Sequence, residues 1–186
     1  PGCKYGRTWP IAPTANTLTM RWERFVSASL DEKPSLFRTA KTGRNIGTRV
    51  PGYAVLNTLK AGTPHQPVVR YGYRSFDRQW ALQDPRVTAL ERPALWESVS
   101  PSQLFFMAPM TKQMSAGPTL TVSQHVPDLH MFRGSFGGKD VLPLYRDKDA
   151  QQPNLTLGLQ QELAARLDID RPTPEDIFAY VYSLLS

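Results

Sequence analysis

The fold class is decided by the stretch VVRYGYRSF at residues 68–76, near the middle of the chain. Val69, Tyr71 and Tyr73 alternate with polar or small residues, and alternating side chains of a strand point to opposite faces. Arg70 and Arg74 fall on the face away from these apolar side chains. The alternation therefore predicts a β-strand with one buried face and one basic face.

Short apolar runs on the C-terminal side of this stretch predict further strands at residues 104–107, 119–122, 130–132 and 141–144. Gly117-Pro118 and Gly137-Gly138 lie between these runs, as turns between strands require. The 17 prolines favour loops and sheet edges over a helical bundle. Residues 34–145 are therefore predicted to be β-rich, with short and mostly antiparallel strands.

Helices are predicted at both ends. Residues 17–26 place apolar side chains at helical spacing, with Asn16 or Thr17 as the cap. Residues 173–176 supply a capping Thr, a first-turn Pro and two acids, so a second helix begins there. Leucines four residues apart predict another helix over 155–167. Both C-terminal helices are predicted to pack in the core, the last one through Ile177, Tyr180, Val181, Leu184 and Leu185.

The size of the chain predicts one main domain, because 186 residues with 40% apolar content bury one substantial core. Its parts are a lead-in with a helix (1–33), the β-rich part (34–145) and the C-terminal helices (146–186), which together give the α+β class. No apolar run approaches the length of a membrane span, and Cys3 has no second cysteine to pair with. A cytoplasmic protein that continues beyond Ser186 is expected.

Positive charge is concentrated in the front of the chain. Residues 1–145 hold 18 Lys and Arg against 9 Asp and Glu, whereas residues 146–186 hold 4 against 7. Residues 34–76 contain seven basic residues and no acid. A surface without carboxylates approaches phosphates more easily, so a polyanionic partner is indicated.

Catalytic motifs are not apparent. His125, Asp128 and His130 lie close in sequence, but Pro127 excludes the helical register in which paired histidines usually bind a metal. Residues 132–140, FRGSFGGKD, have neither the glycine spacing nor the hydroxyl residue of a Walker phosphate loop. The chain is therefore predicted not to be an enzyme by itself and to hold no metal or cofactor.

The most distinctive motif is YGYRSFDRQW at residues 71–80, followed by Arg92-Pro93. It resembles the Tyr-Arg-Pro-Phe-Asp-x-Arg-Trp signature in the C-terminal region of type ISP restriction-modification enzymes, with Ser75 in place of proline. Further matches follow in the expected order over nearly the whole chain, at residues 5–10, 22, 126–128, 142–145, 153–155 and 175–182.

The resemblance implies that this chain is the DNA specificity domain of such an enzyme. Type ISP enzymes join a nuclease, an ATP-driven translocase and an adenine-N6 methyltransferase to a domain that selects an asymmetric DNA site. The implied partners are double-stranded DNA and the methyltransferase and translocase domains of the same parent chain. S-adenosylmethionine, ATP and Mg²⁺ would be bound by the parent and not by this part.

Two roles are expected for the polar residues. The signature is interpreted as a structural corner in which Arg74 pairs with Asp77 and aromatic rings pack; its residues are Tyr73, Arg74, Phe76, Asp77, Arg78 and Trp80. DNA contacts are expected mainly from loops, where long side chains reach groove edges. The candidates are Lys41, Arg44, Asn45, Arg49, Arg70, Lys112, Gln113, Ser115, Arg133, Ser135 and Lys139.

Two other functional classes remain open. A protein-interaction scaffold within a larger DNA-processing enzyme would use aromatic and leucine-rich faces, and its binding would resist salt. A hydrolase would need a concave site around His125, Asp128 and His130. A nucleic-acid module differs from both because its binding weakens steeply with salt.

Overall fold

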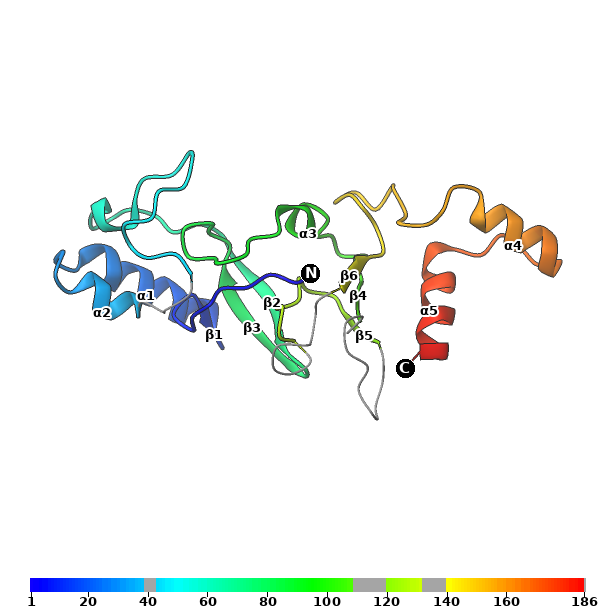
Figure 1. Cartoon of the computed structure of the whole chain (residues 1–186), viewed down its shortest axis with the longest axis horizontal. Coiled ribbons are helices and arrows are strands. Elements are labelled where there is room, and N and C mark those ends of the chain that lie inside the picture. The colour runs from blue at the N-terminus through cyan, green and yellow to red at the C-terminus, as the bar shows by residue number, and fades with distance from the viewer. Residues whose placement is uncertain (39–42, 109–119, 132–139, 186) are drawn as a thin grey trace. The chain divides into compact units, whose positions relative to one another are not determined.

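The computed structural model describes residues 1–38, 43–108, 120–131 and 140–185 of the chain. The described residues form helices and two small antiparallel sheets, which confirms the α+β class (Figure 1). They group into two compact units, Cys3–Glu91 and Pro1–Gly2 with Arg92–Ser186, called here the N-terminal and C-terminal units. A single recognition domain over residues 1–186 stays a prediction. None of the described helices is long and apolar enough to cross a membrane.

The sheet of the N-terminal unit has the order β1-β3-β2, with all neighbours antiparallel. Its strands are β1 (Ile11–Ala12), β2 (Val68–Arg74) and β3 (Asp77–Leu82). The predicted strand is confirmed up to Arg74, and β2 and β3 form the long hairpin drawn in green in Figure 1. Tyr71 is fully buried whereas Arg70 is exposed, as predicted, but Val69, Tyr73 and Arg74 are all half-buried, so the predicted alternation of faces is confirmed only in part.

Two helices and a 3₁₀ turn complete the N-terminal unit: α1 (Ala15–Ser27), α2 (Lys33–Phe37) and η1 (Leu56–Thr58). Helix α1 confirms the predicted helix but begins two residues earlier, because Thr14 is the cap and its Oγ1 accepts from Thr17 N at 3.2 Å. Neither Asn16 nor Thr17 is the cap, since both lie inside the helix.

An aromatic cluster forms the core beside α1. The rings of Trp9, Trp22, Phe25 and Phe37 have centroids 5.3–6.4 Å apart. Burial of each large apolar side chain contributes about 1.5–3 kcal/mol, and tilted rings add to this. Tyr5 joins the core to the sheet, because its hydroxyl donates to the Leu82 carbonyl oxygen at 2.8 Å.

The sheet of the C-terminal unit has the order β5-β4-β6, again antiparallel. Its strands are β4 (Phe105–Ala108), β5 (Thr121–Ser123) and β6 (Asp140–Pro143), and a short helix, α3 (Pro93–Glu97), precedes them. Three predicted apolar runs thus become strands. The strand predicted at 130–132 is wrong for its described residues, because His130 N donates to Asp128 Oδ1 at 2.7 Å and closes a turn instead.

A buried glutamine fastens this sheet at its start. Gln103 is fully buried, and its amide nitrogen donates to the carbonyl oxygens of Ser98 at 2.6 Å and Tyr145 at 2.8 Å. Its amide oxygen accepts from the backbone N–H groups of Leu104 and Tyr145, each at 3.1 Å. Because the amide is satisfied on both sides, it links the segments that enter β4 and leave β6 without leaving a buried polar atom unpaired.

The C-terminal helices are α4 (Leu159–Leu167) and α5 (Pro174–Leu185). Helix α5 begins where predicted, and Thr173 and Asp176 exchange cap hydrogen bonds of 3.1 and 2.9 Å. Its buried residue is Phe178, which stacks on Phe106 with the ring centroids 3.3 Å apart. The predicted core face is therefore only partly correct, since Tyr180 is 66% exposed.

Helix α4 differs more from its prediction. Gly158, at φ +82°, precedes it, so the first four residues of the predicted helix lie outside it. None of its residues is buried, and Leu167 is 61% exposed. The prediction that this leucine-rich segment packs in the core is wrong.

Candidate nucleic-acid interface

The positive charge of the chain belongs to the N-terminal unit. Residues 3–91 hold 14 Lys and Arg against 6 Asp and Glu, whereas the rest of the chain holds 8 against 10. Three of the 14 basic side chains, those of Arg7, Lys33 and Arg86, are buried in structural roles. Asp84 is buried as well, so the unit has 11 other basic residues against 5 other acidic ones, and this excess of +6 is concentrated in three places.

The first is a loop over residues 43–54, which holds the predicted contacts Arg44, Asn45 and Arg49. The loop is fastened through backbone carbonyl groups. Arg7 Nη2 donates to the Arg44 carbonyl oxygen, and the Asn57 N–H donates to that of Ile46 at 3.0 Å. Arg49 is exposed and Arg44 is half-buried. Both side chains therefore reach the surface from a loop whose backbone is anchored by these hydrogen bonds.

Asn45 also shapes the loop through its side-chain oxygen. Its Oδ1 accepts from Gly47 N at 2.9 Å and from Thr48 Oγ1 at 3.3 Å, which closes a turn within the loop. Bidentate reading of adenine needs both the oxygen and the nitrogen of the amide. In this conformation the oxygen is engaged, and the nitrogen is the part of Asn45 that remains to meet a base edge.

Arg7 is the internal support of the same loop. It is 9% exposed, and its guanidinium lies over the Phe37 ring with 4.0 Å to the centroid. Burial lowers the pKa of this guanidinium. Its Nε and Nη1 atoms have no hydrogen-bond partner among the described residues, so burying this guanidinium costs solvation free energy. The hydrogen bond to the loop carbonyl oxygen and the contact with the ring offset part of that cost.

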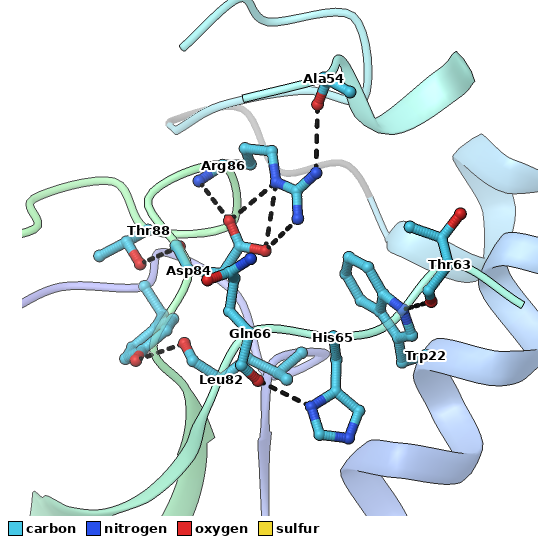
Figure 2. Close-up of polar contacts among 10 residues, drawn as sticks. Trp22, Ala54, Thr63, His65, Gln66, Leu82, Asp84, Arg86 and Thr88 are labelled. Carbon is cyan, nitrogen blue, oxygen red and sulfur yellow. Dashed lines mark hydrogen bonds and ion pairs between the residues drawn. The ribbon is translucent and has the colours of Figure 1, made fainter. Parts of the chain in front are cut away.

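The far end of the loop is held by a buried ion pair, shown in Figure 2. Asp84 and Arg86 are 1% and 4% exposed, and Arg86 Nη2 lies 2.7 Å from Asp84 Oδ2, with Nε 3.0 Å from Oδ1. The remaining nitrogen, Nη1, donates to the Ala54 carbonyl oxygen at 3.1 Å. The pair thus joins the end of β3 to the end of the basic loop.

The second place is the outer face of the β2–β3 hairpin. Arg70 pairs with Trp80 across the strands, and its guanidinium lies 5.0 Å from the centroid of the indole ring. Gly72 pairs with Arg78, which is exposed. The predicted contact Arg70 therefore lies beside a second arginine on the solvent side of the strand pair, where planar guanidinium groups are available to phosphates.

The turn between β2 and β3 holds three of the signature residues, and one of them differs from its predicted role. Arg74 and Asp77 are Cα partners, with Ser75 and Phe76 between them. The guanidinium of Arg74 lies 4.0 Å from the Tyr73 ring centroid, and Asp77 Oδ1 accepts from Gln79 Nε2 at 2.5 Å. Phe76 is fully exposed, so its expected packing is wrong. Ser75 occupies the first central turn position, where the proline of the resembling signature is also favoured.

The third place is a cavity of about 370 Å³ beside α1 and α2, which sequence reasoning missed. Arg21, Arg24 and Arg38 line it, together with the hydroxyl-bearing residues Thr8 and Ser35. Arg21 is anchored because its Nη1 donates to the carbonyl oxygen of Ile11 at 2.8 Å. Burial, and to a smaller extent the charge of Arg38, lowers the pKa of Arg21, so the guanidinium groups repel one another across the cavity. An anion would relieve that repulsion.

One signal for this cavity was present in the sequence. Arg21 and Arg24 are three residues apart and so lie on one side of the predicted helix. Arg38 is distant from both in sequence and is brought to them by α2, at whose end it adopts φ +51°. The third arginine could not be assigned without the structure.

Other predicted residues fall outside this arrangement. The candidates outside the described residues are Lys41, Lys112, Gln113, Ser115, Arg133, Ser135 and Lys139. Asp128 is buried, with its Oδ1 3.4 Å from His130 Nδ1, where it shapes the turn described above. Over residues 1–38, 43–108, 120–131 and 140–185, no group of three His, Cys, Asp or Glu side chains could hold a metal ion.

Comparisons with known proteins place the chain in a family. A comparison with curated proteins finds no match. Among solved structures, the chain is similar to part of a cryo-EM structure of a DrdV–DNA complex, with 18% identity and a TM-score of 0.60 over 99% of this chain and 19% of that chain. It also matches a nuclease-deletion mutant of the type ISP restriction-modification enzyme LlaGI in complex with a DNA substrate mimic. There the identity is 11% and the TM-score 0.47, over 94% of this chain and 16% of that chain.

The chain therefore spans about a fifth or less of each of these solved chains, and the likeness to the first shows a shared fold. The model of the type ISP C-terminal specificity domain matches residues 1–186, which is the whole chain. The chain belongs to the family of type ISP C-terminal specificity domains.

Proposed function

We propose that this chain recognises a target sequence in double-stranded DNA for a restriction-modification enzyme. The observation that carries the proposal is the concentration of exposed arginines in the N-terminal unit, whose net charge is +8 against −2 for the rest of the chain. A polyanion gains from such a surface because phosphate contacts release counterions. Membership of a specificity-domain family makes DNA the polyanion that fits this surface best.

The three basic places suit different contacts with the duplex. The cavity formed by Arg21, Arg24 and Arg38 suits a phosphate, because several guanidinium groups converge on one volume. Arg44 and Arg49 lie on a loop, where an arginine can reach the O6 and N7 atoms of a guanine. In this proposal the cavity positions the DNA backbone and the loop reads base edges.

Chemistry belongs to other parts of the parent enzyme in this proposal. The chain holds the duplex while a neighbouring methyltransferase domain extrudes an adenine, and it has no turnover of its own. S-adenosylmethionine, ATP and Mg²⁺ would act in those other parts. Methylation or cleavage of DNA by the 186-residue chain alone, with these cofactors added, would contradict this division of labour.

The first test is fluorescence anisotropy with a labelled duplex at increasing KCl concentration. Binding is expected at low salt without ATP, metal or methyl donor, and it should fall steeply towards physiological salt. Selection of bound duplexes from a random pool, followed by sequencing, then separates target recognition from general affinity. Salt-sensitive binding without an enriched sequence would leave only a non-specific DNA-binding unit.

Matched variants test the arginine cavity directly. The double variant Arg24→Gln, Arg38→Gln should reduce the slope of log K against log salt by about 1.8, since each lost phosphate contact contributes about 0.9. Arg166→Gln is the control, because Arg166 is an exposed arginine of the C-terminal unit that pairs with Glu162. Arg166→Gln removes one charge and the double variant removes two, so a change in slope half as large in the control would show that total charge, and not this cavity, determines binding.

An additional protein-binding role is favoured by one specific observation. Tyr180 and Leu184 are 66% and 65% exposed on α5, and Leu167 and Ile169 are exposed in the segment that precedes this helix. Exposed apolar side chains of this size commonly mark a protein interface. We propose that these side chains contact another domain of the parent enzyme. Tyr180→Ser with Leu184→Ser should then leave DNA binding by the chain unchanged and weaken its association with a separately produced methyltransferase domain.

A further inference from the structure

The tip of the β2–β3 hairpin carries a residue that the fold does not use. Phe76 is 107% exposed, so its ring buries no area against the rest of the chain. Its φ is +63°, in the left-handed region, which residues other than Gly, Asn and Asp rarely adopt. The second central position of a turn with positive φ is ordinarily glycine or asparagine. Phe76 therefore weakens the hairpin, and its ring is available to a partner.

The surroundings of Phe76 indicate the charge of that partner. Arg70 and Arg78 lie on the outer face of the same two strands, and Arg74 ends β2 directly before the turn. Asp77 is the only carboxylate within residues 68–82, and its Oδ1 accepts from Gln79. An aromatic ring at the end of a ribbon with three arginines complements a partner that combines phosphates with flat apolar surfaces.

Nucleic acid has both properties. A two-stranded ribbon fits a DNA groove, and phenylalanine is among the side chains that wedge between base steps and unstack them. The aromatic face stacks on any base, so the contact does not require a particular sequence. Arginines along the ribbon would hold the phosphates on either side while the tip enters the stack.

We propose that the β2–β3 hairpin enters a groove of the duplex and that the Phe76 ring inserts at a base step, locally unstacking it. This inference rests on the proposed function, since it assumes that the chain binds duplex DNA. It adds a deformation of the DNA to the contacts with phosphates and base edges. Insertion would give a function to a ring that is fully exposed at a left-handed backbone position.

The test compares the 186-residue chain with two variants at Phe76. Phe76→Asn removes the ring but suits the left-handed backbone, so its melting temperature should equal or exceed that of the parent chain. Phe76→Trp keeps an aromatic face. Leu157→Asn is the control, because Leu157 is 101% exposed in the C-terminal unit. Each protein is bound at low salt to a mixed-sequence duplex, or to a sequence enriched from the random pool.

Permanganate oxidises unstacked thymines wherever they occur, so it scans the whole duplex and finds the position of insertion by itself. The parent chain, Phe76→Trp and Leu157→Asn should produce a hyper-reactive thymine within the protected region. Phe76→Asn should lose that reactivity and bind about 5- to 150-fold more weakly, as for loss of one base–aromatic stack.

The outcomes separate this inference from the proposed function. If the parent chain does not bind duplex DNA at low salt, the proposed function fails, and insertion fails with it. If Phe76→Asn binds as tightly as the parent chain, or the parent chain leaves every thymine unreactive, insertion is overturned while DNA recognition stands. Association of Phe76 with another domain of the parent enzyme would belong to this second outcome, because DNA binding by the chain would not depend on the ring.

Discussion

Replacing Asp84 by alanine should destabilise the N-terminal unit strongly. The change leaves the Arg86 guanidinium, which is 4% exposed, without the carboxylate that contacts it at 2.7, 3.0 and 3.2 Å. Removing one partner of a buried pair costs about 3–5 kcal/mol, because the other charge remains in a medium that solvates it poorly. The free energy of unfolding of the unit should fall by that amount.

Urea unfolding followed by tryptophan fluorescence measures this change. Trp22 is a suitable reporter, because the Arg86 guanidinium lies 5.4 Å from its ring centroid and its Nε1 donates to the Thr63 carbonyl oxygen at 2.7 Å (Figure 2). With a slope of about 1–3 kcal/mol per molar urea, the midpoint should move down by more than about 1 M. The matched control is Glu162→Ala, which breaks an exposed pair with Arg166 and should cost less than about 0.5 kcal/mol.

A double variant tests the reasoning itself. Asp84→Leu with Arg86→Met removes both charges together, so it should recover most of the stability that Asp84→Ala loses. Two hydrogen bonds are still lost, from Arg86 Nη1 to the Ala54 carbonyl oxygen and from the Arg86 N–H to Asp84 Oδ1, which leaves a deficit of about 1–2 kcal/mol. A midpoint for Asp84→Ala no lower than that of the Glu162→Ala control would refute the argument. So would a double variant as unstable as the single one.

Two further predictions concern the C-terminal unit. Burial and the 2.5 Å hydrogen bond to Glu175 Oε1 raise the pKa of Tyr145 to about 12, so its neutral form stabilises the fold fully below pH 10 and this contribution is lost as the pH rises towards 12. Urea midpoints measured from pH 8 to 11.5 should therefore fall more steeply for the parent chain than for Tyr145→Phe, and parallel curves would exclude this titration as the cause. Thr173→Ala should cost about 0.5–2 kcal/mol, because it removes the cap of α5 that accepts from Asp176 N at 3.1 Å. Thr173→Ser, which keeps the hydroxyl, should restore the helical circular dichroism melt; failure to do so would place the cost elsewhere.

Local patterns predicted the elements whose signals are local. The alternation over residues 68–74 gave β2, and the sequence Thr-Pro-Glu-Asp gave the start of α5, because strand faces and helix caps depend on neighbouring residues. Strand β3 was not predicted, since DRQWAL lacks a clear alternation and owes its pairing to β2. The four-residue leucine spacing overextended α4, because Gly158 ends the regular structure on its N-terminal side.

The candidate site was less accessible to sequence reasoning. Arg44, Arg49 and Arg70 could be proposed from charge and position, but the cavity needs Arg38 beside α1, a long-range contact. The pairing of Arg74 with Asp77 stays a prediction, and the buried ion pair of Asp84 with Arg86 was not predicted, because these residues lie two apart in a segment with no periodic pattern. Burial of such a pair depends on the surrounding core, which no local pattern records.

The basic loop is anchored through its backbone and not through its side chains. Its anchors are the carbonyl oxygens of Arg44, Ile46 and Ala54, which accept from Arg7, Asn57 and Arg86 outside the loop. A carbonyl group is present whatever side chain the residue bears, so these anchors survive exchange of the loop's own side chains. If the loop reads base edges as proposed, its side chains could be exchanged, by recombination or by design, to change the target sequence while the residues that anchor its backbone stay the same.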